Sequence, residues 1–443
     1  ITETVCKHQQ RINHYKGEVS SHHFFNVLTN DTLLDKIESL LPEHRERRYP
    51  PTETLSMFLA QAMNDDRSCQ NIVNQFTLQR LSEGLSGGST YTGGYCRARQ
   101  RLPLTLITEI TQHIGRHIER QTPNKWCWQG RRVKIVDGTT VSMPDTAANQ
   151  EAYPQQGGQK TGLGFPICRI VGITCLSSGA LLNAAIGRFS GKGGDEQTLL
   201  RSIQDTFEQG DVILGDAFYA TYFFIAAMQK RGVDILMEQY GARKRSTDFR
   251  KGKRLGGRDH LITICKPKKR PYWMNEAQYN EVPDELTVRE CKAGGKIMVT
   301  TMTCPKIYDK EALKGLYKSR WNIELDIRNI KDTMGMGILS CKTPEMVVKE
   351  VWVYLLAYNI IRFLMAQSAL HADVEPRQIS FKHCLQLWLV YWQHMKQYDD
   401  ENMEKLLRLI SQRQVGRRRG RVEPRAVKRR PKPYPLLTVS RDQ

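Results

Sequence analysis

The chain has 443 residues, of which 66 are Lys or Arg and 46 are Asp or Glu, and the resulting formal charge of +20 favours a polyanionic partner. Nucleic acid is the leading candidate for that partner, and an anionic membrane surface is the other class. No run of about 18 apolar residues is present, so we expect no segment that spans a membrane. The length allows two to four domains with a large core.

The 11 cysteines form no C-x-x-C pairs and have no histidine-rich segment beside them, so neither a zinc knuckle nor a disulfide framework is indicated. We expect reduced and mostly buried thiols. Residues 1–13 are polar and charged and contain no apolar signal core, which predicts a cytoplasmic protein.

Residues 1–129 are expected to form a helical N-terminal region that binds DNA. An apolar stripe at helical spacing predicts a helix at residues 52–62, and Asp66 or Ser68 is expected to cap a second helix. Both a helix-turn-helix and a plain helical bundle are compatible with this pair. Three arginines just before Pro103 form a basic edge that faces either a DNA backbone or only solvent, namely Arg97, Arg99 and Arg101.

From residue 130 to residue 238, β-rich runs alternate with helical periodicity. The order is strand, strand, strand, helix, strand, helix, strand, at residues 131–137, 167–176, 180–188, 196–207, 211–216, 217–230 and 233–237. This order matches a ribonuclease-H-like α/β fold, in which the first and fourth strands lie side by side and parallel. Asp137 and Asp216 end these two strands, so we expect them to meet at one edge of the sheet. For either aspartate alone, a loop cap is the alternative.

Residues 239–309 interrupt the core with a basic, glycine-containing stretch and alternating strands, which predicts a basic β insertion. Cations and aromatic residues are interleaved from Lys268 to Trp273, a pattern suited to a DNA backbone and a stacked base. An aromatic side chain packed on the core at a sheet edge is the alternative for Trp273.

A helix is expected from Lys310 to about Gly335, where glycine provides the C-cap. At about 100° per residue, five polar side chains of this helix fall within roughly 80° of one another. They are Tyr317, Arg320, Glu324, Arg328 and Lys331. One carboxylate surrounded by a phenol and three cations suggests an acid aimed at a phosphate. A surface helix with an i,i+4 ion pair is the alternative.

Residues 341–410 are rich in Leu, Tyr and Trp, and they predict a helical C-terminal region that packs on the sheet or forms a dimer surface. Long helices are expected at residues 345–370 and 381–396. Residues 411–443 form a basic tail, in which ten residues between Arg413 and Lys432 are Lys or Arg. This tail is too charged to fold alone, and it either orders on DNA or adds non-specific affinity.

Three of these acids, Asp137, Asp216 and Glu324, are the set that phosphodiester cleavage requires. Carboxylate oxygens bind hard divalent cations, and two such cations can activate the attacking oxygen and stabilise the leaving oxygen. Arginine suits a bidentate clamp on the flanking phosphates, and lysine supplies a point charge.

The spacing Tyr317-x-x-Arg320-x-x-x-Glu324-x6-Lys331 resembles the Y-(2)-R-(3)-E-(6)-K signature of bacterial insertion-sequence transposases of the insertion sequence four family. Asp137 stands in a sequence context similar to that of the family's first catalytic acid, and Asp216 in one similar to that of the second. The resemblance is specific over residues 130–331. It implies a DDE transposase with a ribonuclease-H-like catalytic core at residues 130–238 and 310–340, interrupted by the insertion at 239–309.

The resemblance also implies the site and its cofactor. Asp137, Asp216 and Glu324 take the places of catalytic residues and metal ligands, with two Mg²⁺ ions for which Mn²⁺ substitutes. Contacts to DNA and its phosphates are expected from Tyr317, Arg320, Lys331, Arg328, Trp321 and Trp273. Trp321 matches a residue that distorts the DNA strand in a relative.

The implied reaction is cut-and-paste transposition. Related members cut the terminal inverted repeats of the element, form a hairpin, reopen it and join the 3′ ends to target DNA. Double-stranded DNA and a second copy of the chain, in a homodimer that pairs two ends, are the implied partners. The alternatives are a ribonuclease-H-like nuclease that never joins DNA, and an inactive DNA-binding relic of a transposase.

Overall fold

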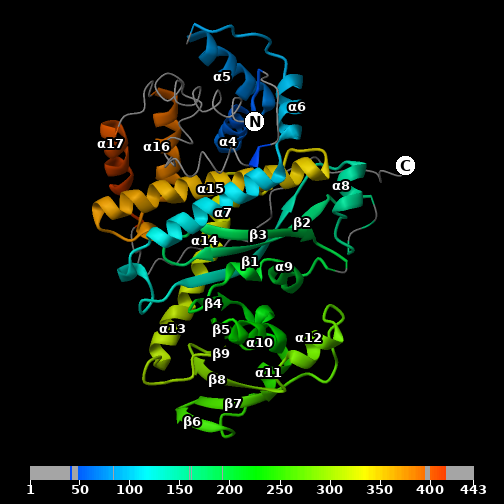
Figure 1. Cartoon of the computed structure of the whole chain (residues 1–443), viewed down its shortest axis with the longest axis vertical. Helices are drawn as coiled ribbons and strands as arrows, with labels where there is room; N and C mark the ends of the chain where they lie inside the picture. Colours follow the sequence, from blue (N-terminus) through cyan, green and yellow to red (C-terminus); the bar gives the residue numbers. More distant parts are fainter. Residues whose placement is uncertain are drawn as a thin grey trace.

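The computed structural model of the chain describes residues 40–41, 48–82, 84–158, 160, 162–191, 193–394 and 400–415. Its centre is one nine-stranded sheet with the strand order β3-β2-β1-β4-β5-β9-β8-β7-β6. A helical layer lies beyond the β3 end of the sheet, and the insertion strands lie at the opposite end (Figure 1). Residues 1–39 of the predicted N-terminal region and residues 416–443 of the predicted basic tail lie outside the described residues.

The first half of the sheet is built from the short apolar runs that the sequence indicates. Its strands are β1 (Val133–Ser142), β2 (Ile167–Cys175), β3 (Leu181–Arg188), β4 (Val212–Gly215) and β5 (Asp234–Glu238). β1, β2 and β3 pair antiparallel, whereas β1, β4 and β5 pair parallel. Helices α9 (Glu196–Ser202) and α10 (Tyr222–Lys230) pack on one face. The predicted order of elements is therefore confirmed, and the core is ribonuclease-H-like.

β1 is longer than predicted. It pairs with β4 only up to Ile135, which lies opposite Leu214, but its pairing with β2 continues as far as Ser142. The predicted strand end at Asp137 is wrong, because β2 still supplies hydrogen-bond partners after β4 has ended. Asp137 therefore lies inside β1, just beyond the point where β1 stops pairing with β4.

The insertion extends the same sheet. Its strands are β6 (Lys253–Gly256), β7 (Asp259–Cys265), β8 (Glu285–Ala293) and β9 (Lys296–Thr300), and β9 pairs antiparallel with β5. A buried ion pair of 2.6 Å between Arg289 and Asp259 joins β7 to β8. The predicted β insertion is thus attached to the core through a continuous backbone ladder.

The N-terminal helices are α4 (Pro51–Met63), α5 (Cys69–Ser82), α6 (Gly93–Arg101) and α7 (Leu104–Gln121). Ser68 caps α5, since its Oγ accepts a 3.1 Å hydrogen bond from the backbone N–H of Asn71. Arg97 and Arg101 are exposed, but Arg99 is buried and its guanidinium lies 4.8 Å from the ring centroid of Phe58. The expected basic edge therefore lacks Arg99, because α6 turns this side chain towards α4.

The C-terminal region is built on α15 (Pro344–Ala372), which packs against α7, α4 and the helices α16 (Phe381–His394) and α17 (Asp400–Ser411). α15 is long and apolar enough to cross a membrane, but 89% of its most apolar window is buried inside the protein. Burial of that extent is typical of a core helix. Figure 1 shows α15 and α7 side by side, between the sheet and the helices α4, α5 and α6.

The helix predicted from Lys310 is an irregular helical path, here called the Glu324 segment (residues 310–333). It consists of α13 (Lys310–Lys318), a 3₁₀ turn (Ser319–Trp321), α14 (Asn322–Arg328) and a π-helical turn (Asn329–Thr333). Gly335 follows with φ of +86°, as expected for a glycine C-cap. The changes of helical period mean that the five predicted polar residues do not share one regular face.

Asp326 fixes the Glu324 segment to the helical layer. Its carboxylate is buried and lies 2.5 Å from Arg362 of α15 and 2.9 Å from Arg377. A buried carboxylate with two arginine partners holds its position strongly, because moving it away would leave the two guanidinium charges uncompensated.

Candidate active site

Asp137 and Asp216 are brought together by strand register. Ile135 of β1 lies opposite Leu214 of β4, and each aspartate follows two residues later in its own chain segment. Asp216 directly follows β4 and accepts a 2.8 Å hydrogen bond from the backbone N–H of Phe218, so it also caps the next turn. The expectation that the two aspartates meet at one edge therefore agrees with the register.

Arg320 links the first aspartate to the Glu324 segment. Its Nη1 lies 3.7 Å from Oδ2 of Asp137, and its Nη2 lies 3.4 Å from Oε1 of Glu324. The Arg320 side chain is largely buried, whereas Glu324 is 42% exposed. The guanidinium thus stands between two of the three predicted catalytic carboxylates.

The surroundings of Asp137 disfavour its negative charge. The pKa of Asp137 is raised to about 6, chiefly by burial and also by the charges of Asp216 and Glu196, against the lowering effect of the N–H of Gly138 and the guanidinium of Arg320. A raised carboxyl pKa means that the folded chain disfavours the ionised form of Asp137, chiefly because the carboxylate is largely removed from water.

The donor set suits a hard divalent cation, because all of the predicted ligands are carboxylates. Within the described ranges, however, no three Asp, Glu, His or Cys side chains are grouped closely enough to hold one metal ion. The residues fit the ion by the chemistry of their oxygen donors, and Glu324 accepts a 3.4 Å hydrogen bond from Arg320.

Tyr317 and Lys331 contact protein groups beside the acids. Tyr317 is buried, burial raises its pKa to about 12, and Nζ of Lys296 lies 5.6 Å from its ring centroid. Nζ of Lys331 donates to Oγ1 of Thr139 at 3.2 Å and to the carbonyl of Thr140 at 2.7 Å. Lys331 thereby fastens the Glu324 segment to the part of β1 just beyond Asp137.

Arg328 and Trp321 lie at the surface. Trp321 is 60% exposed, and the guanidinium of Arg320 lies 5.9 Å from its ring centroid. Arg328 is exposed and forms no ion pair with another residue of the described part of the chain. Both side chains are therefore accessible to a large ligand that approaches the acids.

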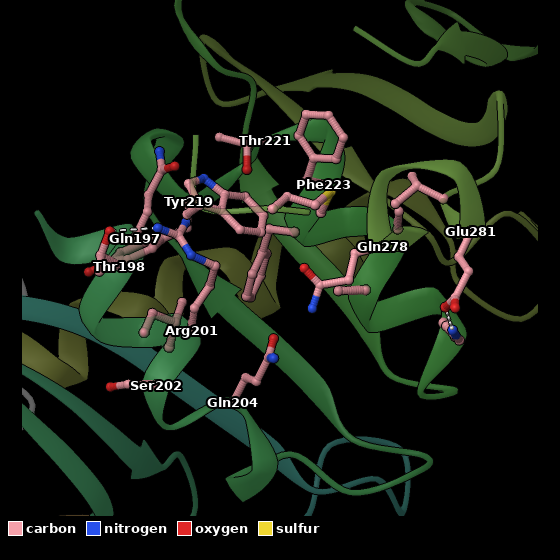
Figure 2. A pocket seen from close by; sticks show the side chains of 18 of the residues that line it. Gln197, Thr198, Arg201, Ser202, Gln204, Tyr219, Thr221, Phe223, Gln278 and Glu281 are labelled. Atoms are coloured by element: carbon pink, nitrogen blue, oxygen red, sulfur yellow. Dashed lines mark hydrogen bonds and ion pairs between the residues drawn. The ribbon is translucent and has the colours of Figure 1, made fainter. Parts of the chain in front are cut away.

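Trp273 lines a cavity of about 570 Å³ whose lining includes Tyr219 but none of the three predicted catalytic acids. The guanidinium of Arg201 lies 4.1 Å from the Trp273 ring centroid, and Phe223 meets the ring edge-on at 6.1 Å. Figure 2 shows Arg201 and Tyr219 at one side of this cavity, and Gln278 and Glu281 of α12 (Glu276–Glu281) at the other. One face of Trp273 is thus already occupied by a cation.

Glu196 is a fourth carboxylate at the site, and the sequence patterns did not single it out. It is the first residue of α9, and its Oε2 accepts a 3.0 Å hydrogen bond from the hydroxyl of Tyr219, which also lines the cavity. Its Oε1 lies 3.8 Å from Nε of Arg169. A Cβ at Gly138 would lie 2.5 Å from Cδ of Glu196, so this carboxyl group occupies the space that the glycine leaves. The glycine directly after Asp137, together with an acid at the first position of α9, is the sequence signal that could have pointed to Glu196.

Comparisons with known proteins show the family of the chain. The chain is 27% identical over 405 residues to the transposase InsG for insertion sequence element IS4 of Escherichia coli (strain K12), with 88% of each chain covered. It is also similar to the structure of the piggyBac transposase synaptic complex with hairpin DNA, with a TM-score of 0.43, 8% identity, and 89% of this chain and 86% of that chain covered. A family model described as the transposase DDE domain matches residues 128–360, which is more than half of the chain. The chain therefore belongs to the family of DDE transposases, which are enzymes that act on DNA.

Proposed function

We propose that this transposase cuts DNA at the terminal inverted repeats of an insertion sequence and joins the 3′ ends to target DNA by divalent-metal-dependent phosphoryl transfer. The observation that carries the proposal is the gathering of Asp137, Asp216 and the Arg320–Glu324 pair from three elements far apart in the sequence. Carboxylates and a guanidinium in one place are the groups that phosphoryl transfer needs, and no nucleophilic side chain is required.

The proposed cofactor is Mg²⁺, with two ions per site and Mn²⁺ able to replace them. Asp137, Asp216 and Glu324 would hold the ions, which when bound supply Lewis acidity and neutralise charge on the phosphate. The raised pKa of Asp137 supports this assignment, because a cation beside the carboxylate offsets the loss of hydration on burial and also the repulsion from its acidic neighbours.

Arg320 is proposed to hold a phosphate of the DNA end. A guanidinium has five N–H donors in a planar fork that matches a phosphate, and such pairs are frequently bidentate. Two of its nitrogens face Asp137 and Glu324. A phosphate that binds Arg320 competes with Glu324 for these donors, and the released Glu324 is then free to act as a metal ligand.

The remaining predicted contacts take different parts in this proposal. Lys331 positions β1 and the Glu324 segment against each other through Thr139 and Thr140, so its role is positioning as well as charge. Trp321 and Arg328 meet the DNA at the surface, where Trp321 distorts the strand. Tyr317 is buried, so it is proposed to support Arg320 from within the protein. Its hydroxyl would reach a phosphate only at the edge of the site.

Glu196 is proposed as a positioning residue for Asp137. Its carboxylate stands over Gly138 and adds negative charge beside Asp137, and the Tyr219 hydroxyl fixes it. The cavity that Tyr219 and Trp273 share is proposed to receive an unstacked base of the DNA end.

A homodimer is proposed for the DNA complex, because two ends must be brought together. The core helix α15 is buried within one chain, so the subunit contact falls on more exposed parts. Val390 of α16 and Leu409 of α17 are large apolar side chains that are half exposed, and they mark the proposed surface.

The test is a strand-transfer assay with a DNA end that carries the correct inverted repeat, a target plasmid and Mg²⁺. We expect joined products with the wild-type chain, and no cleavage but undiminished DNA binding with Asp137→Asn. Cut DNA without any joined product would favour the nuclease without joining activity. DNA binding without cleavage by the wild-type chain would favour the inactive relic.

A further inference from the structure

A second cavity, whose lining includes none of the three proposed catalytic acids, contains a pair of cysteines. It has a volume of about 630 Å³ and lies between the helices α4 to α6 and the start of α15. Cys69, Cys96, Cys341 and the guanidinium of Arg99 are among the groups that line it. The two thiols that concern us are partly accessible, since Cys69 and Cys96 are both of intermediate exposure.

One guanidinium nitrogen lies within hydrogen-bond distance of both thiols. Nη2 of Arg99 lies 3.2 Å from Sγ of Cys69 and 3.9 Å from Sγ of Cys96. Cys69 is the first residue of α5, where the helix N-terminus also favours negative charge, and Cys96 lies inside α6. The sulfurs of two different helices are thus brought to the same positive group.

Arg99 is a buried cation with no carboxylate partner. Its Nη1 donates to Oε1 of Gln61 at 3.2 Å, its Nε has no hydrogen-bond partner, and no ion pair joins it to a carboxylate of the described residues. The rings of Phe58 and Tyr95 flank it at 4.8 and 5.0 Å. A buried charge without a counter-charge is costly. The buried Glu350 lines the same cavity and is within reach of the charge of Arg99, but its oxygens accept hydrogen bonds from the backbone N–H groups of Ser340 and Cys341. A thiolate is therefore the anion that can lie within hydrogen-bond distance of the guanidinium.

The two thiols share their proton unequally. Hydrogen bonding with Cys69 lowers the pKa of Cys96, helped by Arg99, whereas hydrogen bonding with Cys96 and burial raise the pKa of Cys69. Among the other described cysteines, burial raises the pKa of Cys168, Cys291 and Cys384. The pair beside Arg99 therefore combines a thiolate, a neighbouring thiol and access from a cavity, which are the features of a redox-sensitive dithiol.

We propose that Cys69 and Cys96 form a reversible disulfide in response to a peroxide. The Cys96 thiolate attacks one peroxide oxygen, the O–O bond breaks, and the departing hydroxide takes a proton to become water. The Cys96 sulfenic acid formed in this way is attacked by the sulfur of Cys69, an S–S bond forms, and the second water leaves with the Cys69 proton. Two thiols are oxidised and one hydrogen peroxide is reduced to two waters.

A chain of hydrogen bonds connects this pair to the Glu324 segment. Gln61, which accepts from Arg99, donates from its Nε2 to the carbonyl of Arg67 at 2.7 Å. Nη1 of Arg67 in turn donates to the carbonyl of Gly335 at 3.2 Å, directly after the segment ends. Oxidation removes the thiolate that faces Arg99, so Arg99 and Gln61 must find new partners. We expect the turn that carries Arg67 to loosen from Gly335.

The test uses the full chain, reduced and freed of reductant, then treated with hydrogen peroxide. Remaining thiols are blocked with N-ethylmaleimide, and peptides are mapped by mass spectrometry without reduction. We expect a peptide that links Cys69 to Cys96 to appear before other cysteines are oxidised, and dithiothreitol to remove it. A link from either cysteine to Cys341, or oxidation elsewhere while both remain alkylated, would overturn the proposal.

Three variants keep the proposal falsifiable. In Arg99→Gln, assayed at a pH below the lowered pKa of Cys96, the disulfide should form about tenfold more slowly, because in that range a rise of one unit in the thiol pKa reduces the thiolate fraction about tenfold. Because Arg99 is buried, Cys69→Ser is the second variant, and here Cys96 should stop at a sulfenic acid that dimedone traps. The exposed Cys265 offers a matched control, and Cys265→Ser should leave the rate unchanged. Equal rates in Arg99→Gln, or no dimedone adduct in Cys69→Ser, would contradict the mechanism.

Hydrogen exchange tests the connection to the Glu324 segment. Oxidation of the wild-type chain should increase amide exchange at residues 64–68 and 333–337, and Cys69→Ser treated in the same way should show no increase. Unchanged exchange in the oxidised wild-type chain would overturn the connection.

Discussion

Replacing Asp137 by Asn should stabilise the folded chain at neutral pH, although it removes a proposed catalytic group. The pKa of Asp137 is raised from 3.8 to about 6, chiefly by burial. A carboxyl group whose pKa is higher in the folded than in the unfolded chain disfavours folding once it is ionised. The penalty is absent below about pH 4, grows as pH rises to about 6, and is full above that.

The magnitude follows from the size of the shift. A difference of about two pKa units corresponds to roughly 3 kcal/mol at 1.36 kcal/mol per unit. Asn keeps an oxygen that can accept the 2.8 Å hydrogen bond from the N–H of Gly138. We therefore expect Asp137→Asn to gain about 1–3 kcal/mol at pH 7.5 and about zero at pH 4.

The assay is urea unfolding of both chains between pH 4 and pH 8, first without a divalent cation and then with Mg²⁺. Mg²⁺ should raise the midpoint of the wild-type chain, because an ion that binds only the folded state stabilises it, and should raise that of Asp137→Asn less. Asp326→Asn is the matched control of opposite sign. It should destabilise by about 3–5 kcal/mol, because two arginines lose their buried partner. A loss of stability in Asp137→Asn at pH 7.5, or a gain of equal size at pH 4, would refute the reasoning.

Three further outcomes are expected. Arg320→Ala should raise the pKa of Asp137 by about one to three units and slow strand transfer on the order of a hundredfold, while the exposed Lys318→Ala on the same segment stays close to wild type in the same assay. Gly138→Ala should displace Glu196, because the new Cβ would meet its Cδ at 2.5 Å, and should cost about 1–3 kcal/mol in urea unfolding, whereas Gly157→Ala, with open space around it, should be neutral. Trp273→Ala should weaken binding of a DNA end with an unpaired terminal base by about 1–3 kcal/mol more than that of a fully paired end, and an equal loss for both would remove the base from the cavity.

The core could be predicted from the sequence because its signals are local. Short runs of Val, Ile and Leu alternate with helical periodicity, and the topology then follows from the order of the elements. The end of β1 could not be predicted, since it depends on which neighbouring strand continues to pair beyond Asp137. The breaks in the Glu324 segment are likewise set by its packing, where Asp326 is held by Arg362 and Arg377.

The contacts predicted from the sequence are those between residues close together on one segment. Contacts between residues of distant elements were missed. Arg320 and Glu324 are four residues apart, so their contact follows from helical geometry. Glu196 reaches Gly138 from another helix, and Trp273 reaches the cavity from the insertion. The burial of Arg99 shows the same limit, because charge alone placed it at the surface, whereas the packing of α6 on α4 places it beside two thiols.

The most direct test of the proposed metal-assisted mechanism is a change of metal specificity at Glu324. Thiolates are softer ligands than carboxylates and bind Mg²⁺ poorly but accept Mn²⁺ more readily. In a strand-transfer assay, Glu324→Cys should be inactive with Mg²⁺ and regain joined product with Mn²⁺, while DNA binding stays at the wild-type level. Full activity of Glu324→Cys with Mg²⁺, or a loss that Mn²⁺ does not relieve while DNA binding persists, would contradict the role of Glu324 as a metal ligand.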